Sequence, residues 1–489
     1  MKTKITLMVL MLSFINAFSQ KDSIDTFIES QMMMRKIPGL QLAIIKKNRI
    51  VKLNSYGVAN IEDSIAVDNE TIFSINSITK AFVGVSVMQL VEQGRLDLNV
   101  EIKTYLTDIP KKWQSITLKQ LLTHTSGLPH ILSNDTGGLI SEKGIDVSWE
   151  IVKSLPMISE PNAKFKYNQL GYILIGKIID KVYGISFTDY IIKNQLQKVG
   201  MKRTEEAGFS NLNDVVRHSA KRYTFYYGQN ISNIKSEFYP SILQTAAGMG
   251  STSKEIANWI IALQTGMLFN QKSSLDLLWK PALLNNGETQ GFNNLLNGYA
   301  LGWPTVSRSK HPAIAAVGGN RAGVFVYPND DLSVVVLTNL MGALPSKFID
   351  EIAGYYIPDM KEKNGFGLPD FIKMLWKELE LNGYKESIVI ARQLQKNKKL
   401  KFDETNLNSW GYKLIESNNT KKALEIFKLN VHLFPKSGNA FDSLAEVYAL
   451  LGLNTEAIKN YETALRLNPD NINAEKQIKK LNKINSKNN

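Results

Sequence analysis

The chain has 489 residues, 44% of them hydrophobic, so it is long enough for several packed domains and too apolar for a disordered polypeptide. Its formal charge of +13 comes from 58 basic and 45 acidic residues. The basic residues are scattered along the chain, which argues against nucleic-acid binding. The lack of cysteine excludes disulfides and a cysteine nucleophile, and the five histidines have no metal-ligand spacing. We therefore expect no metal and no cofactor.

The first 19 residues have the pattern of a secretory signal peptide. Two lysines precede a mostly apolar run over residues 5–14, and Ala17 and Ser19 are the small residues expected before cleavage at Gln20. The run is short for a membrane span, although an uncleaved anchor is the alternative. We predict a periplasmic or secreted protein with no membrane span after cleavage.

Two hairpins are predicted at distant places in the chain. Runs rich in β-formers over residues 40–45 and 50–56 flank a polar turn, and a second pair covers residues 323–327 and 332–338. Helical patterns fill much of the space between them. The pattern favours an α+β fold, in which one antiparallel sheet is packed by helices.

Ser77 and Lys80 form a Ser-x-x-Lys pattern at the start of an apolar stretch. Positions i and i+3 share one face of a helix, so Lys80 is expected beside Ser77. A buried amine can lose its proton and then act as a base for a serine hydroxyl. Residues 81–91 are apolar on nearly every side, which predicts a buried helix. The alternative is an N-cap serine followed by a solvent-exposed lysine.

Three further motifs fall at places that suit one active site. Residues 119–128 read Lys-Gln-Leu-Leu-Thr-His-Thr-Ser-Gly-Leu, after a possible N-cap at Thr117. Tyr167-Asn168-Gln169 precedes an apolar helical pattern over residues 173–182, and the glycine-rich segment 318–323 leads into the second hairpin.

Residues 403–482 carry a repeat of 34 residues, the length of a tetratricopeptide repeat. The matched pairs are Trp410/Leu444, Gly411/Ala445, Leu414/Tyr448, Ala423/Ala457, Phe427/Tyr461 and Pro435/Pro469. Trp376 lies one period before Trp410, so residues 369–400 are a possible degenerate first repeat. We predict a helical connector over residues 346–402 and tetratricopeptide repeats over residues 403–485, with core-packed aromatics and a groove that could hold a protein partner.

Together, these motifs resemble those of the serine β-lactamase and penicillin-binding-protein superfamily. The resemblance is strongest to the branch that contains class C β-lactamases, D-alanyl-D-alanine carboxypeptidases and esterases. It covers residues 22–345 and includes the segments 299–303 and 337–339. It implies a β-lactamase-like domain over residues 20–345, with an antiparallel sheet flanked by helices and a helical subdomain.

The resemblance also implies roles for individual residues. Ser77 would be the nucleophile, Lys80 would accept or shuttle its proton, and Tyr167 would be a general base and then an acid for the leaving group. The backbone N–H groups of Ser77 and Gly319 would form the oxyanion hole. His124 would be a hydrogen-bonded turn histidine rather than the partner of a Ser-His pair. Whether Lys80 or Tyr167 is the acylation base stays open.

Two positions depart from the family pattern. Gln169 replaces the usual Asn of the tyrosine motif, and Ala316 stands where the family has Lys or His before the oxyanion strand. Gln169 and Arg321 are the candidates for substrate positioning, because Arg321 could replace the missing positive charge if it pointed into the cleft. The missing basic or imidazole side chain at Ala316 weakens the case for a true β-lactamase or D-alanyl-D-alanine peptidase. It favours an esterase-like hydrolase.

The sequence therefore predicts a serine hydrolase that forms an acyl-enzyme on Ser77 with an ester, amide or peptide-type substrate. One alternative is a catalytically weakened protein that binds or senses cell-wall peptides and recruits a partner through its repeats. Another makes the repeats the main functional module and the hydrolase domain a scaffold. The substrate and the oligomeric state are open.

Overall fold

The computed structural model describes residues 22–133, 138–209, 215–225, 230–234, 240–361, 365–417 and 419–488. The predicted signal peptide lies outside the described residues. The chain divides into two compact units, one ending at Ile357 and one beginning at Pro358.

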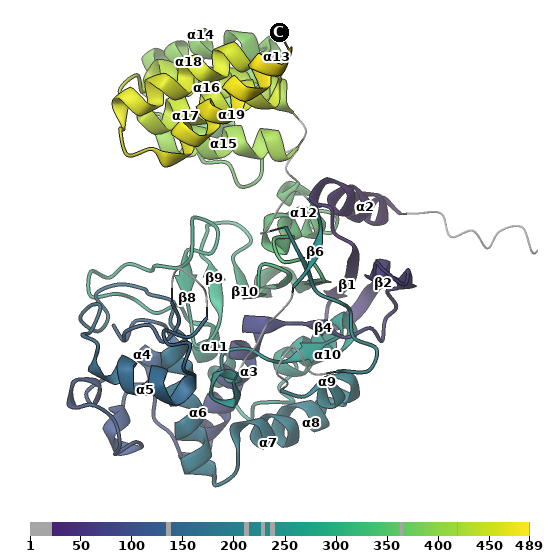
Figure 1. The fold of residues 1–489 in the computed structure, drawn as a ribbon. Helices are drawn as coiled ribbons and strands as arrows, with labels where there is room; N and C mark the ends of the chain where they lie inside the picture. Colours follow the sequence, from purple (N-terminus) through teal and green to yellow (C-terminus); the bar gives the residue numbers. More distant parts are fainter. Residues whose placement is uncertain are drawn as a thin grey trace, which may run out of the picture. The chain divides into compact units, whose positions relative to one another are not determined.

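The first unit is built on an eight-stranded antiparallel sheet with the order β3-β2-β1-β12-β11-β10-β9-β8 (Figure 1). The strands are β1 (Gly39–Lys46), β2 (Arg49–Asn60), β3 (Ile65–Ala66), β8 (Gly298–Tyr299), β9 (Pro304–Val306), β10 (Ala313–Gly318), β11 (Ala322–Tyr327) and β12 (Leu332–Thr338). Strands from both ends of the unit meet at its centre, where Leu42 of β1 lies opposite Val336 of β12. The predicted antiparallel sheet with helices is confirmed.

Both predicted hairpins are present, and the first has a shorter turn than expected. Lys46 pairs with Arg49, which leaves only Lys47 and Asn48 in the turn between β1 and β2. Both residues have positive φ values, of 49° and 57°. Two consecutive left-handed residues form the tight turn that matches the twist of antiparallel strands.

Helices cover both faces of the sheet. The Gln41 side chain accepts a hydrogen bond from the first residue of α10 (Ser253–Gln264), whereas the Tyr56 hydroxyl donates to Asp25 of α2 (Ser23–Arg35). Tyr56 lies opposite Leu40, and side chains alternate along a strand, so α10 and α2 lie on opposite faces (Figure 1). The largest hydrophobic core lies on the α10 side and contains α3 (Thr79–Glu92).

The other helices of this unit lie beside α3, where they form a helical subdomain, or at the edges of the unit. They are α4 (Leu118–Leu122), α5 (Ile145–Ser154), α6 (Gln169–Tyr183), α7 (Phe187–Ile191), α8 (Gln197–Val199), α9 (Lys202–Ala207), α11 (Lys272–Trp279) and α12 (Ile349–Ala353). The predicted N-cap at Thr117 is confirmed, because its side chain accepts from the Gln120 N–H in a capping box that begins α4. Helix α6 begins at Gln169, earlier than the predicted 173.

The predicted domain boundary at residue 345 is too early. Helix α12 packs on β12, and its side chains Ile349 and Ile352 are fully buried together with the preceding Phe348. Residues 346–357 therefore belong to the first unit, because their apolar side chains complete its core.

The second unit consists of paired helices. They are α13 (Asp370–Asn382), α14 (Ser387–Lys398), α15 (Glu404–Glu416), α16 (Thr420–Leu433), α17 (Gly438–Leu450), α18 (Asn454–Leu467) and α19 (Ile472–Asn488). Helices α13, α15, α17 and α19 begin 34 residues apart, at 370, 404, 438 and 472, the spacing read from the sequence. Trp410, Phe427 and Tyr461 are buried, as expected for core aromatics. The assignment of these pairs to tetratricopeptide repeats stays a prediction.

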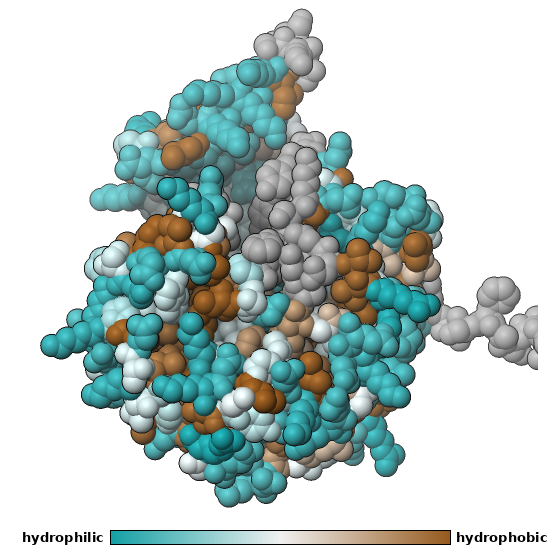
Figure 2. Space-filling view, turned by 60° about the horizontal axis from the view of Figure 1, so that its bottom comes forward, coloured by the Kyte–Doolittle hydropathy of each residue, from teal (hydrophilic) through white to brown (hydrophobic). Residues whose placement is uncertain are grey.

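One face of the molecule is shown in a space-filling view (Figure 2). On the face shown in Figure 2, hydrophilic residues cover most of the area and hydrophobic residues form separate patches. Within the described ranges, no helix combines the length and the hydrophobicity that crossing a membrane requires.

Candidate active site

Ser77 lies in a 3-10 turn (Asn76–Ile78) that runs directly into α3. The residue before the serine, Asn76, has a left-handed backbone with φ 46°. Because α3 itself begins at Thr79, Ser77 precedes the helix by a tight turn instead of forming its N-cap. Ser77 is partly exposed and lines a pocket, so its hydroxyl is accessible to a substrate.

Lys80 is fully buried and reaches back to Ser77. Its Nζ lies 3.3 Å from Ser77 Oγ and donates a second hydrogen bond of 2.7 Å to the Ala246 carbonyl. The alternative of a solvent-exposed lysine is therefore wrong. The two side chains share one helical face, as the i, i+3 spacing predicts.

Burial lowers the pKa of Lys80 well below its ordinary value. The Nζ also lies 4.8 Å and 5.2 Å from the ring centroids of Tyr167 and Tyr172, and these contacts favour the charged form. A desolvated cation–π contact is worth about 2 kcal/mol, whereas full burial of an ammonium costs several kcal/mol. Burial therefore favours the neutral amine, which can accept a proton, and the two ring contacts offset part of this effect.

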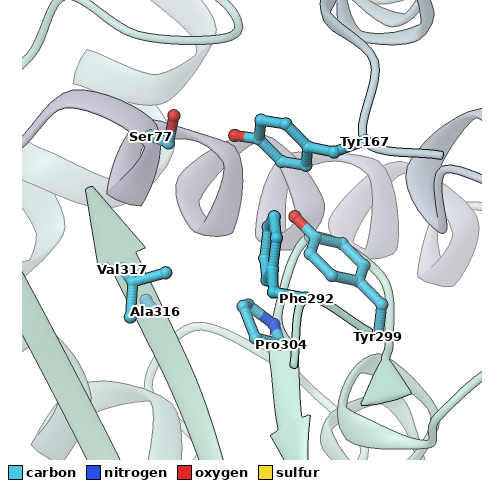
Figure 3. A pocket seen from close by; sticks show the side chains of 8 residues that line it. Ser77, Tyr167, Phe292, Tyr299, Pro304, Ala316 and Val317 are labelled. Carbon is cyan, nitrogen blue, oxygen red and sulfur yellow. The ribbon is translucent and has the colours of Figure 1, made fainter. Parts of the chain in front are cut away.

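Tyr167 faces Ser77 from the segment that leads into α6. Asn168 caps this helix by accepting from the Leu170 and Gly171 N–H groups, so Tyr167 is the last residue before the cap. In Figure 3 its hydroxyl points toward Ser77. The three residues Ser77, Lys80 and Tyr167, which come from two separate segments, therefore meet at one place.

The end of β10 packs closely against the Ser77 turn. A methyl group added at Gly318 would lie 2.0 Å from the Ile75 carbonyl oxygen and 3.1 Å from the Ser77 nitrogen. The next residue, Gly319, has φ 55° and would place a methyl group 2.9 Å from the Asn76 side chain. Glycine is needed at both positions for this approach, which brings the end of β10 next to the Ser77 turn.

The site opens into a small pocket. It is lined by Ser77, Tyr167, Phe292, Tyr299, Gly302, Pro304, Ala316 and Val317 (Figure 3). None of these eight side chains is charged, and aromatic rings dominate. Ala316, the position where the family has Lys or His, lies in the wall of this pocket. Phe292 was not found from the sequence, because it lies in an irregular segment without a periodic pattern.

The two predicted substrate-positioning residues do not line this pocket. Gln169 is the first residue of α6, and its Oε1 is buried without a hydrogen-bond partner in the described parts of the chain. Arg321 is fully buried behind Gly319, with its Nε 3.2 Å from the position of a methyl group added there. Its side chain is therefore enclosed by protein rather than exposed in the cleft.

His124 is a buried turn histidine, as expected. It is 1% exposed, its φ is 58°, and its Nδ1 accepts a hydrogen bond of 3.1 Å from the Asn168 N–H. Burial and the nearby Lys80 lower the pKa of its imidazole well below the usual value. The side chains in the described ranges include no group of three or more His, Asp or Glu arranged to hold a metal ion.

Comparison with known proteins identifies the family of the first unit. The model of the beta-lactamase family matches residues 24–354. The chain belongs to this family. It is 25% identical over 339 residues to Protein flp of Staphylococcus aureus (strain MRSA252), which covers 68% of this chain and 65% of that protein. The chain thus spans slightly less than two thirds of the length of that relative.

Two solved structures show the same fold as this beta-lactamase-family unit. The penicillin-binding protein from Bacillus halodurans aligns with a TM-score of 0.57 and 23% identity, covering 68% of this chain and all (100%) of that one. EstCE1, described as a hydrolase with promiscuous acyltransferase activity, aligns with a TM-score of 0.57 and 19% identity over 68% of this chain and 97% of its own. At these identities the likeness concerns the fold.

Proposed function

We propose that this beta-lactamase-family protein is a serine hydrolase that forms an acyl-enzyme on Ser77. The observation that carries the proposal is the fully buried amine of Lys80, 3.3 Å from a pocket-lining serine hydroxyl. A serine is a weak nucleophile unless a base takes its proton. The lowered pKa of Lys80 makes its neutral amine the acylation base.

In the proposed reaction, Ser77 Oγ attacks the carbonyl carbon of the substrate and its proton passes to Lys80 Nζ. The negative charge that develops on the carbonyl oxygen is stabilised by the N–H groups of Ser77 and Gly319. The bond to the leaving group then breaks, and the proton held by Lys80 passes through the Tyr167 hydroxyl to the leaving group, which restores the neutral amine. Water hydrolyses the resulting ester and releases Ser77.

The pocket favours neutral acyl esters over substrates with a carboxylate beside the scissile bond. Ala316 offers no positive charge, and the residues that line the pocket are uncharged and include three aromatic rings. A buried carboxylate without a partner is costly. Esters also need less assistance at the leaving group than amides, which suits a site where one tyrosine supplies the proton.

The predicted signal peptide supports the further proposal that this activity is periplasmic or secreted. N-terminal sequencing of the exported protein would test it. A mature N-terminus at or near Gln20 is expected, and an intact Met1 would contradict cleavage.

The acyl-enzyme is tested by labelling with a fluorophosphonate and with a fluorescent penicillin, followed by peptide mass mapping. We expect a fluorophosphonate adduct on Ser77 that is absent in Ser77→Ala. Ser86→Ala is the matched control, because Ser86 lies buried on α3 and donates to the Phe82 carbonyl, and it should keep the label. Folded protein that reacts with neither reagent would contradict the proposal and favour a binding or sensing role.

A further inference from the structure

His124 accepts two hydrogen bonds, one from each residue that flanks Tyr167. The His124 carbonyl accepts from the Lys166 N–H at 2.9 Å, and its Nδ1 accepts from the Asn168 N–H at 3.1 Å. One residue therefore holds the backbone immediately before and immediately after the tyrosine. The first bond depends on the backbone alone, and the second requires an acceptor on the side chain.

The imidazole of His124 also packs against the tyrosine itself. The ring centroids of His124 and Tyr167 are 4.4 Å apart, and Tyr299 and Phe165 enclose the same imidazole at 4.8 Å and 5.9 Å. This histidine ring therefore supports the inner side of the Tyr167 ring within an aromatic cluster.

The rest of the histidine turn pairs with the same segment. The Thr125 carbonyl accepts from the Asn162 N–H, the Gly127 carbonyl accepts from the Ile158 N–H, and the Asn168 side chain donates to the Leu128 and Pro129 carbonyls. Residues 124–129 thus hold the segment that carries Tyr167 through several backbone and side-chain hydrogen bonds.

We propose that His124 is the positioning residue that holds the Tyr167 hydroxyl against Ser77. This inference rests on the proposed function. Because Nδ1 accepts a hydrogen bond, the neutral ring carries its proton on Nε2, and that atom is buried with no hydrogen-bond partner among the described residues. The imidazole therefore acts through packing and through Nδ1 rather than by exchanging a proton with the substrate.

The left-handed backbone at residue 124 guides the choice of variants. Asparagine tolerates positive φ better than other non-glycine residues, and its Oδ1 can accept from the Asn168 N–H. His124→Asn therefore keeps the hydrogen bond, whereas His124→Leu keeps apolar bulk and loses the acceptor. We expect His124→Leu to lower kcat roughly 10- to 100-fold for a neutral ester, since a misplacement of about 1 Å can cost that much, with KM nearly unchanged. His124→Asn should recover most of kcat.

His311→Asn is the matched control. This histidine also has positive φ, of 51°, and its Nδ1 bonds to Asp330, but it precedes β10 at the end remote from Gly318. It should retain wild-type kcat. The inference would be overturned if His124→Leu and His124→Asn lost kcat to the same extent and also lost thermal stability to the same extent. It would also be overturned if His124→Leu kept wild-type kcat.

A measurement on the unmodified protein does not depend on variant folding. Histidine-selective ¹⁵N NMR should give an unprotonated Nδ1 and a protonated Nε2 for His124 across neutral pH. A proton on Nδ1 would overturn the inference. Failure of wild-type protein to label at Ser77 would instead contradict the proposed function, so the two failures are distinguishable.

Discussion

Replacement of Lys80 by methionine separates the chemical role of the buried amine from its structural role. Methionine has a similar length and no charge, so Lys80→Met removes the proton acceptor 3.3 Å from Ser77 Oγ and keeps most of the volume. General-base assistance contributes about 10²- to 10⁴-fold, or roughly 3–5 kcal/mol of transition-state free energy. We expect the rate of fluorophosphonate labelling to fall about 10³-fold.

The same variant should lose little stability. It leaves the Ala246 carbonyl without its donor, a cost of about 1–3 kcal/mol, but it also removes a buried amine whose desolvation opposes folding. Thermal unfolding by circular dichroism at pH 7 should therefore show a melting temperature close to that of the wild type. A folded Lys80→Met protein that labels within threefold of the wild-type rate would refute the assignment of Lys80 as the base.

The pH dependence of stability gives an independent check on Lys80. Burial lowers its pKa in the folded protein below the ordinary 10.5. Between these two values the unfolded chain binds one more proton than the folded chain, so the wild-type free energy of unfolding decreases as the pH falls through this interval. Lys80→Met lacks this contribution. The free energy of unfolding of Lys80→Met minus that of the wild type, measured by urea titration, should therefore increase as the pH is lowered from about 10 to 7. If this difference stayed constant, Lys80 would have an ordinary lysine pKa in the folded protein.

Three further changes test the surroundings of Ser77. Tyr167→Phe should slow turnover of esters with poor leaving groups by about 10²-fold or more, whereas the rate of fluorophosphonate labelling should fall less. If stopped-flow assays showed equal decreases in the two rates, a role of Tyr167 at the leaving group would be contradicted. Gly318→Ala should displace the Ser77 turn, because its methyl group would lie 2.0 Å from the Ile75 carbonyl oxygen. We expect kcat to fall about 10²- to 10³-fold, as for loss of an oxyanion donor. A crystal structure with an unmoved turn, together with full activity, would refute this. Ala316→His should raise kcat/KM for carboxylate-bearing esters relative to neutral ones, and unchanged selectivity would show that Ala316 does not control this preference.

The sequence predicted those features that depend on local spacing. Ser77 and Lys80 meet because three residues make almost one helical turn, and the second hairpin follows from β-forming runs around a Pro-Asn-Asp-Asp turn. The 34-residue period of the sequence matches the spacing between the starts of α15, α17 and α19. In each case the interactions that decide the structure lie within a few residues or recur at a fixed interval.

The pocket wall could not be predicted in the same way. Phe292 has no periodic pattern around it, and it reaches the site because the chain folds back closely at Gly291, where a methyl group would lie 2.2 Å from the Leu296 carbonyl oxygen. The direction of Arg321 also depends on tertiary packing, since the same residue could face the cleft or the interior. The boundary at residue 345 was missed because α12 is short and its apolar face is recognisable only against β12.

Stability alone does not account for the amine at position 80. Burial of a lysine costs folding free energy. Among the described residues Lys80 contacts one carbonyl, one hydroxyl and two ring faces but no carboxylate, and these contacts recover only part of that cost. An apolar side chain of similar volume would fill the site at least as well. The same burial that opposes folding keeps the amine neutral beside an accessible serine hydroxyl. The physical benefit of Lys80 therefore lies in the reactivity of Ser77 rather than in the stability of the fold.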